Sequence, residues 1–236
     1  MSISKKIGKI AIISLIGLAS LFPKKTKAEE IQEKPAVNLS LDNAFSNKYL
    51  FWGLNFWDKP VWQPMFNLNI NYLTLNLFGN MEIGSRDVNE ADAFVDFTYP
   101  INKINTSLGA GYYNFKINGK WVKDRELYTK IGMNIPLNPS IVFHRLFGLG
   151  KGSYTEASLS EDVEINNLVA NLSGKLGYDT SKYREGRGFS HVEAGIKVPI
   201  KLTEKMSIIP NINFSKALAR DLENEIYGGI NWRYDF

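Results

Sequence analysis

The stretch FNLNINYLTLNLFGNMEI, which runs from Phe66 to Ile83, decides the fold because apolar and polar side chains alternate along most of it. Leu, Ile and Phe take one set of alternate positions, and Asn, Thr and Glu take the other. Successive side chains of a β-strand point to opposite faces, so each half predicts a strand with one apolar and one polar face. The alternation changes phase at Asn71-Tyr72, which predicts a tight turn between two antiparallel strands.

The same period of two continues along the chain, and no segment shows a sustained helical period. The sequence therefore predicts an all-β chain of about twelve strands, or ten if the weakly alternating segments around Ile141 to Asp162 are loops. The predicted strands are 36–53, 63–71, 73–84, 91–100, 104–116, 125–136, 140–148, 152–162, 166–179, 189–202, 206–216 and 224–236.

The connections between these strands alternate in character. Tight turns are predicted at Asn71-Tyr72, Ile101 to Lys103, Leu137 to Pro139 and Thr203 to Lys205. Longer charged or Gly-rich loops are predicted at Asn55 to Trp62, Ser85 to Glu90, Ile117 to Asp124, Thr180 to Gly188 and Ala217 to Glu223. Short turns at one end and longer loops at the other are typical of a transmembrane antiparallel up-and-down β-barrel, in which an even strand number puts both termini in the periplasm.

The first 28 residues have the layout of a secretory signal peptide. Lys5, Lys6 and Lys9 precede an apolar run from Ile10 to Phe22, which is short for a membrane span, and a small-residue site ends at Ala28. We therefore predict a leader at 1–28, a periplasmic tail at 29–35 and a barrel at 36–236, with a retained N-terminal anchor helix as the alternative. Removing the six leader lysines from the 28 basic residues leaves 22 against 24 acidic ones, so the mature chain has a formal charge of −2.

Several classes of function are disfavoured by composition. The basic residues that raise the overall charge belong mostly to the leader, so they do not indicate nucleic-acid binding. The chain has no Cys, which excludes disulfides, thiolate metal sites and a lipoprotein anchor. No motif indicates a bound cofactor, and two His residues without a supporting cluster do not predict a metal site.

The C-terminal stretch from Ile226 to Phe236 favours the barrel further. Every even position from 226 is apolar, aromatic or Gly, and the last residue is aromatic, which resembles the terminal signal read by the barrel-assembly machinery. Aromatic residues near predicted strand ends predict girdles at the two membrane interfaces. They are Trp52, Trp57, Trp62, Tyr72, Tyr99, Tyr112, Tyr113, Trp121, Tyr178 and Tyr234.

Two short motifs carry a family resemblance. The stretch SNKYLFWG from Ser46 to Gly53 is followed by the Pro60 to Gln63 element, and GSYTE begins at Gly152. In these motifs and in its overall layout the chain resembles the TorF-like family of porins, which opens with an S-x-Y-x-F-R-G strand. Trp52 stands where that family has Arg, and one extra residue separates Ser46 from Tyr49. The resemblance implies an outer-membrane barrel rather than a particular substrate.

The polar face of each predicted strand would line the interior of the barrel, the lumen. We predict an acidic wall of Glu82, Asp92 and Asp96 and a local basic wall on neighbouring strands that carry Lys175, Glu193, Lys197 and Lys201. The presence of both signs disfavours strong selectivity for one sign of charge. The predicted lining residues are Asp42, Glu82, Asp92, Asp96, Lys130, His144, Glu156, Lys175, Glu193, Lys197, Lys201, Arg233 and Asp235.

A catalytic site needs a nucleophile beside a base, and the sequence does not predict one. His144 and His191 lie on strands far apart in order, and strict alternation points Ser190 away from the face of its neighbour His191. We therefore do not expect an enzyme.

The sequence predicts a porin-like channel of the outer membrane for passive passage of small hydrophilic solutes or ions. The expected partners are outer-membrane lipid and lipopolysaccharide, those solutes, and the assembly machinery acting through Phe236. The alternatives are a non-conducting structural or adhesive barrel that acts through its outer loops and a lipid-modifying barrel enzyme.

Overall fold

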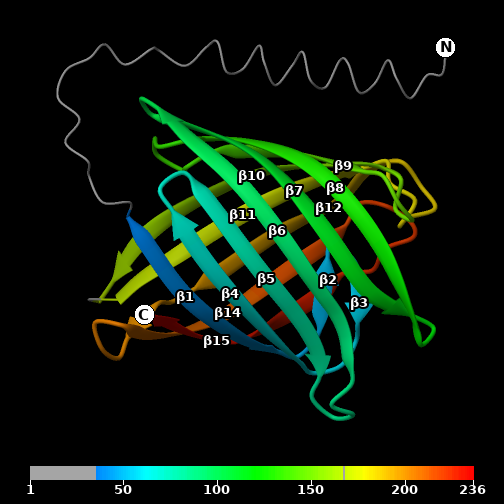
Figure 1. Cartoon of the computed structure of the whole chain (residues 1–236), viewed down its shortest axis with the longest axis horizontal. Coiled ribbons are helices and arrows are strands. Elements are labelled where there is room, and N and C mark those ends of the chain that lie inside the picture. The colour runs from blue at the N-terminus through cyan, green and yellow to red at the C-terminus, as the bar shows by residue number, and fades with distance from the viewer. Residues whose placement is uncertain (1–35, 167) are drawn as a thin grey trace. The chain divides into compact units, whose positions relative to one another are not determined.

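The computed structural model describes residues 36–166 and 168–236. The predicted leader (1–28) and periplasmic tail (29–35) lie outside the described residues. Within the described part the regular elements are all β-strands, as Figure 1 shows. No helix there is long and apolar enough to cross a membrane.

The strands follow the predicted order closely. Their bounds are β1 (Val37–Ser46), β2 (Tyr49–Phe51), β3 (Leu54–Trp57), β4 (Val61–Ile70), β5 (Leu73–Glu82), β6 (Val88–Ile101), β7 (Ile104–Ile117), β8 (Lys120–Met133), β9 (Ser140–Leu146), β10 (Gly152–Ile165), β11 (Leu168–Asp179), β12 (Gly188–Lys197), β13 (Ile200–Lys201), β14 (Met206–Ala217) and β15 (Glu225–Asp235).

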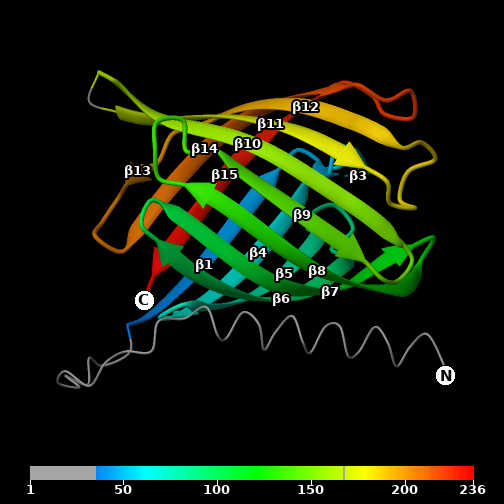
Figure 2. The same cartoon turned by 90° about the horizontal axis from the view of Figure 1, so that it is seen from above.

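The sheet closes on itself as a barrel. Every paired strand is antiparallel to its neighbours, and β15 returns to pair with β1, for example Leu41 with Tyr234. β12 pairs with β14, and short β13 pairs with β14 just beyond the end of β12, so these two share one position in the ring. The ring therefore has twelve strand positions, which confirms the predicted fold, and Figure 2 shows the strands crossing the barrel at a tilt.

The two faces of the wall differ in polarity. Leu127, Leu172 and Ile230 are 51%, 43% and 52% exposed on the outer face, and comparable apolar residues recur on the other strands of the ring. Buried groups of the inner side include Asp124, Glu126 and Ser215. An apolar outside around a polar inside matches a wall that faces lipid and encloses water, as in transmembrane barrels.

Both chain ends of the barrel lie at one end, which we call the terminal end; the opposite end is the loop end. Phe236 donates its backbone N–H to the carbonyl of Leu39, close to the start of β1. The turn at Asn71-Tyr72 lies at the terminal end, and the segment after Ser46 leaves β1 at the loop end.

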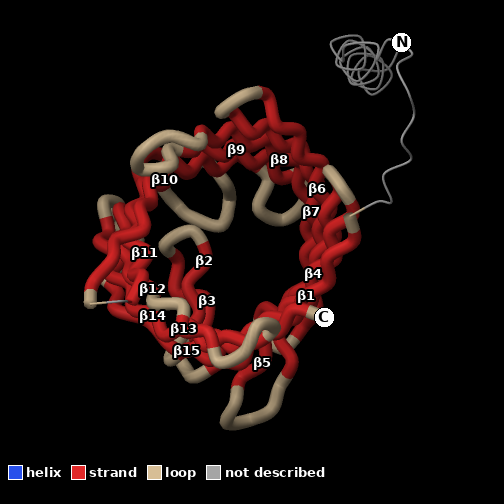
Figure 3. Tube along the Cα trace, turned by 90° about the vertical axis from the view of Figure 1, so that its left-hand side faces the viewer, coloured by secondary structure: helices blue, strands red, loops and turns tan. Residues whose placement is uncertain are grey.

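The prediction of one continuous strand over 36–53 is wrong beyond Ser46, where β1 ends. Asn47 exchanges hydrogen bonds with Gly228: its amide N–H donates to the Gly228 carbonyl (3.1 Å) and its side chain accepts from the Gly228 N–H (3.0 Å). The chain then turns at Trp52 and Gly53, whose φ angles of 53° and 81° are left-handed, and forms a separate β2–β3 hairpin. Figure 3 shows this hairpin inside the ring of strands.

The predicted loop at Ile117 to Asp124 is also wrong. Asn118 and Gly119, with φ angles of 51° and 76°, form a two-residue turn, and β7 and β8 continue to either side of it. Asn-Gly is the preferred pair for such a turn because both positions need positive φ. The loop end therefore carries one tight turn among its longer connections.

Candidate functional site

A polar cavity of about 600 Å³ lies in the lumen. Residues of β1 and β10 line it together although these strands are not neighbours in the ring, so the cavity is inside the barrel. Its polar and charged lining comprises Asp42, Ser158, Ser160, Asn171, Ser173, Lys175, Glu193, Lys197, Asn211, Asn213, Tyr227, Asn231 and Arg233.

The charges of this cavity are interleaved. Lys175 Nζ lies 3.4 Å from Glu193 Oε1, and the Tyr227 hydroxyl donates to Glu193 Oε2 at 2.6 Å. Across the cavity, Arg233 is 3.8 Å from Asp42, which also accepts from the side chain of Asn231. The predicted basic wall is therefore interrupted by a carboxylate, and the cavity has a mixed-charge lining.

The predicted acidic wall is divided between different contacts. Asp92 is buried and accepts a hydrogen bond from the Asn114 N–H at 3.1 Å, and it also faces Glu90. Asp96 is hydrogen-bonded to Tyr128. Glu82 instead accepts from Lys59 and Trp57, which belong to the segment between β1 and β4.

The remaining predicted lining residues do not line the 600 Å³ cavity. His144 is 2.9 Å from Glu126, and the Tyr154 hydroxyl donates to Glu156 at 3.3 Å. Lys130 lines a second polar cavity, of about 420 Å³. Lys201 is exposed on β13, and exposed Asp235 pairs with Arg233.

The β2–β3 hairpin, residues Tyr49 to Trp57, packs aromatic side chains into the lumen. We call it the lumen hairpin. Trp52 stacks on Tyr154, with ring centroids 4.3 Å apart and planes 9° apart. Phe51 meets Tyr113 edge-on at 5.9 Å. Trp52 and Tyr113, which the sequence placed in interfacial girdles, therefore belong to a core inside the barrel, because Trp52 lies in the turn of the hairpin and Tyr113 faces inward from β7.

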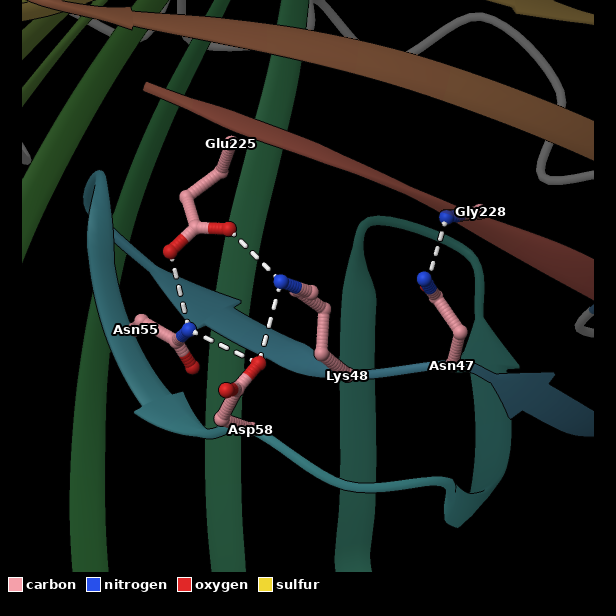
Figure 4. Close-up of polar contacts among 6 residues, drawn as sticks. All are labelled: Asn47, Lys48, Asn55, Asp58, Glu225 and Gly228. Carbon is pink, nitrogen blue, oxygen red and sulfur yellow. Dashed lines mark hydrogen bonds and ion pairs between the residues drawn. The ribbon is translucent and has the colours of Figure 1, made fainter. Parts of the chain in front are cut away.

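Polar contacts tie the lumen hairpin to β15, as Figure 4 shows. Lys48 Nζ lies 2.7 Å from Glu225 Oε2 and 3.0 Å from Asp58 Oδ1. The Asn55 amide donates to the other Glu225 oxygen at 2.9 Å. Hydrogen bonds to Glu225 and Asp58 raise the pKa of Lys48, and the bond from Lys48 lowers the pKa of Asp58. The contacts of Lys48 and Asn55 with Glu225 therefore form a charged clamp between the hairpin segment and β15.

The loops above the hairpin are joined by a second clamp. Arg184, in the β11–β12 loop, makes two hydrogen bonds to Asp221 in the β14–β15 loop, at 3.1 Å from Nε and 2.9 Å from Nη2. These bonds lower the pKa of the Asp221 carboxyl. Nearby, the Tyr183 hydroxyl donates to Asp124 Oδ2 at 2.7 Å and its ring packs against Phe56. These contacts hold the β11–β12 and β14–β15 loops together and place Tyr183 against the hairpin.

A second cavity lies beside the hairpin. It has a volume of about 340 Å³ and is lined by Tyr49 and Leu50 on one side and by Gln63 of the barrel wall on the other. Asn211 and Tyr227 line both this cavity and the 600 Å³ polar cavity, so the two cavities are neighbours. The hairpin therefore narrows the lumen and leaves a cavity between itself and the wall.

Ser190 and His191 both face inward, which corrects the prediction that they point to opposite faces. A bulge places both residues opposite the single Gly177, and Ser190 Oγ lies 3.0 Å from His191 Nδ1. A Cβ on Gly53 would lie 2.6 Å from His191 Cγ, so the hairpin turn sits directly over the imidazole. The pair is packed against the hairpin, and no group of metal-binding side chains occurs in the described residues.

A closed antiparallel barrel with an apolar outside and a polar lumen is a barrel of the outer-membrane type. Solved structures similar to this chain include the KdgM porin, with a TM-score of 0.56 and 12% identity over 84% of this chain and 99% of that one. Another is the KdgM porin in complex with disordered oligogalacturonate, with a TM-score of 0.55 and 9% identity over the same shares. At these identities the likeness is one of fold.

Neither a family model nor a curated protein matches the chain. Membership of the TorF-like family stays a prediction.

Proposed function

We propose that this protein is an outer-membrane channel that lets small hydrophilic solutes or ions pass passively, with the lumen hairpin as its constriction. The observation that carries the proposal is the mixed-charge cavity of about 600 Å³ in the lumen, which has the cavity beside the hairpin as its neighbour. In the proposed orientation the terminal end faces the periplasm and the loop end faces outward, as in other barrels with an even strand number.

The proposed solutes follow from the lining. Arg233 and Lys175 lie beside Asp42 and Glu193, so the cavity offers both donors and acceptors without a uniform charge. Such a lining favours small polar solutes of either sign over one class of ion. The oligogalacturonate of the similar porin is a polyanion. Here Asp42 and Glu193 are interleaved with the basic residues of the cavity, so its lining is not uniformly basic.

The proposed partners follow from the outer face and the C-terminus. The apolar belt would contact outer-membrane lipid and lipopolysaccharide. Phe236, which is 61% exposed beside β1, would be read by the barrel-assembly machinery. We propose no catalytic role, since Ser190 and His191 are covered by the hairpin.

A second candidate is a non-conducting structural or adhesive barrel. The aromatic packing of Phe51, Trp52 and Phe56 against the wall favours it, because such packing could close the lumen completely. The two candidates differ in one observable, the passage of ions.

The test is single-channel conductance of the refolded mature chain in a planar bilayer. Ser173 lines the polar cavity, and its neighbour Leu172 faces outward, so the two positions form a matched pair. We expect ohmic steps from the wild type, steps reduced to about half or less in Ser173→Trp, and unchanged steps in Leu172→Trp, because only the first substitution crowds the lumen. Silence from folded, inserted wild-type protein would overturn the channel and favour the structural barrel.

A further inference from the structure

Two rows of cross-strand neighbours on the outer face of the barrel each end on an arginine. One row pairs Leu77 of β5, Ala93 of β6 and Tyr112 of β7 with Arg125 of β8. The adjacent row runs through Leu75, Val95, Ala110 and Leu127 to Arg145 of β9. Figure 2 shows β5 to β9 as consecutive strands of the wall.

Between the larger side chains of these rows lies an apolar groove of about 930 Å³. Ala93 and Ala110 leave it open, because each sits among bulky neighbours such as Leu77, Tyr112 and Leu127. Strands lie 4.7–4.9 Å apart, so the rows from β5 to β8 give the groove a length of about 15 Å. This length and the apolar lining suit a segment of an extended acyl chain.

Arg125 lines the groove, and Arg145 lies beside it on β9, opposite the lining residue Leu127. Both arginines are exposed, and neither forms an ion pair with any residue of 36–166 or 168–236. Arg145 donates to the neutral hydroxyl of Ser153 at 3.2 Å. The carboxylates that flank Arg125 in sequence, Asp124 and Glu126, are buried on the inner side, where they accept hydrogen bonds from Gly148 and contact His144.

We propose that this groove binds one lipid of the outer leaflet with a net negative, phosphate-bearing headgroup, with an acyl chain over Ala93 and Ala110 and the phosphate at Arg125 and Arg145. Two guanidinium groups present planar donors that match phosphate oxygens, and a guanidinium group is more weakly hydrated than an ammonium group. The site rests on the membrane insertion assumed in the proposed function, and it does not depend on conduction, because both arginines face away from the lumen.

The test is native mass spectrometry of the full mature barrel in detergent, with dioleoyl phosphatidylglycerol as the anionic probe and dioleoyl phosphatidylcholine as the zwitterionic one. We expect the wild type to retain the anionic lipid preferentially. The double variant Arg125→Ala/Arg145→Ala should reduce that retention about tenfold, since each interfacial cation contributes to binding of anionic lipid. Ala110→Phe, which fills the groove, should weaken retention of both lipids.

The matched control is Lys103→Ala/Lys205→Ala, which removes the same charge from exposed positions in terminal-end turns. Retention that is equal in the two double variants, or equal for the two lipids, would overturn the site; so would unchanged retention in Ala110→Phe, because the acyl chain would then contribute nothing. Heat-modifiable migration verifies the fold of each variant. A folded but silent wild type that still selects the anionic lipid would contradict the channel and leave the lipid site standing.

Discussion

At the scale of single residues, Lys48 determines how firmly the lumen hairpin is held. Its ammonium group contacts Glu225 and Asp58, and the side chains of Lys48 and Glu225 are only 18% and 10% exposed. Lys48→Met keeps the aliphatic stem and removes both contacts, leaving Glu225 with the Asn55 amide alone. A charge-assisted hydrogen bond contributes about 1.5–3 kcal/mol, so the ratio of docked to released hairpin should fall about tenfold or more.

Single-channel recording should then show more frequent or larger openings in Lys48→Met than in the wild type. Lys103→Met is the control, because it changes the same residue type in an exposed turn at the terminal end. Unchanged openings in Lys48→Met would mean that aromatic packing alone holds the hairpin.

The contacts of Lys48 predict that the stability of the docked hairpin is constant over a broad range of pH. The pKa of Asp58 is lowered from 3.8, so its contribution is present above that value and is lost as pH falls through the lowered pKa. The pKa of Lys48 is raised from 10.5, so its contribution is present below that value and is lost as pH rises through the raised pKa. The ratio of Lys48→Met conductance to wild-type conductance should therefore be constant and above one between these values, and should fall toward one outside them. A change of this ratio centred near neutrality would contradict the assignment.

At the scale of elements, the spanning strands could be predicted because lipid outside and polar groups inside impose a period of two on residues such as Leu73 to Leu77. The lumen hairpin could not, because Tyr49 to Trp57 is rich in aromatic residues, which favour any strand whether it spans the wall or not. Its inward fold depends on Asn47 meeting Gly228, far away in the sequence. The only local signal is Gly53 after Trp52, which permits the turn.

The Ser190–His191 bulge escaped prediction for a related reason. One extra residue breaks the period of two, and the break is tolerated because Gly177 opposite it has no side chain. At the polar cavity, alternation indicated which side chains share a face. It could not indicate that Lys175 and Glu193 touch, since that contact depends on strand register.

The hairpin itself can be removed as a unit. Replacing Lys48 to Lys59 by a short Gly-Asn-Gly link should leave the barrel closed, because β1 pairs with β4 from Val37 to Ser46 and with β15 independently of the hairpin. Without the aromatic side chains in the lumen, conductance should rise several-fold over the wild type in about 1 M salt, where surface charge is screened. An excised variant that conducts like the wild type would show that the constriction lies elsewhere.

At the scale of the whole molecule, the barrel depends on the seam where β15 returns to β1, since a closed sheet leaves no unpaired edge in lipid. The seam is tight at the loop end. Ser46 faces Gly229, and a Cβ added to Gly229 would collide with the carbonyl of Phe45 and lie 2.9 Å from the Cα of Ser46. Both obstacles are backbone atoms, so a side-chain rotation cannot relieve them.

Gly229→Ala should therefore weaken closure by an amount typical of overpacking, about 1–3 kcal/mol. The measurement is the urea midpoint of the refolded barrel in detergent, followed by heat-modifiable migration. Gly132→Ala is the matched control, because its Cβ would meet only the Ser140 side chain, at an ordinary 3.7 Å. A lowered midpoint in Gly229→Ala alone would locate the weakest part of the ring at the β1–β15 seam. Equal midpoints would mean that β1 and β15 separate slightly at the loop end, where the pairing stops and the chain leaves β1 for the hairpin.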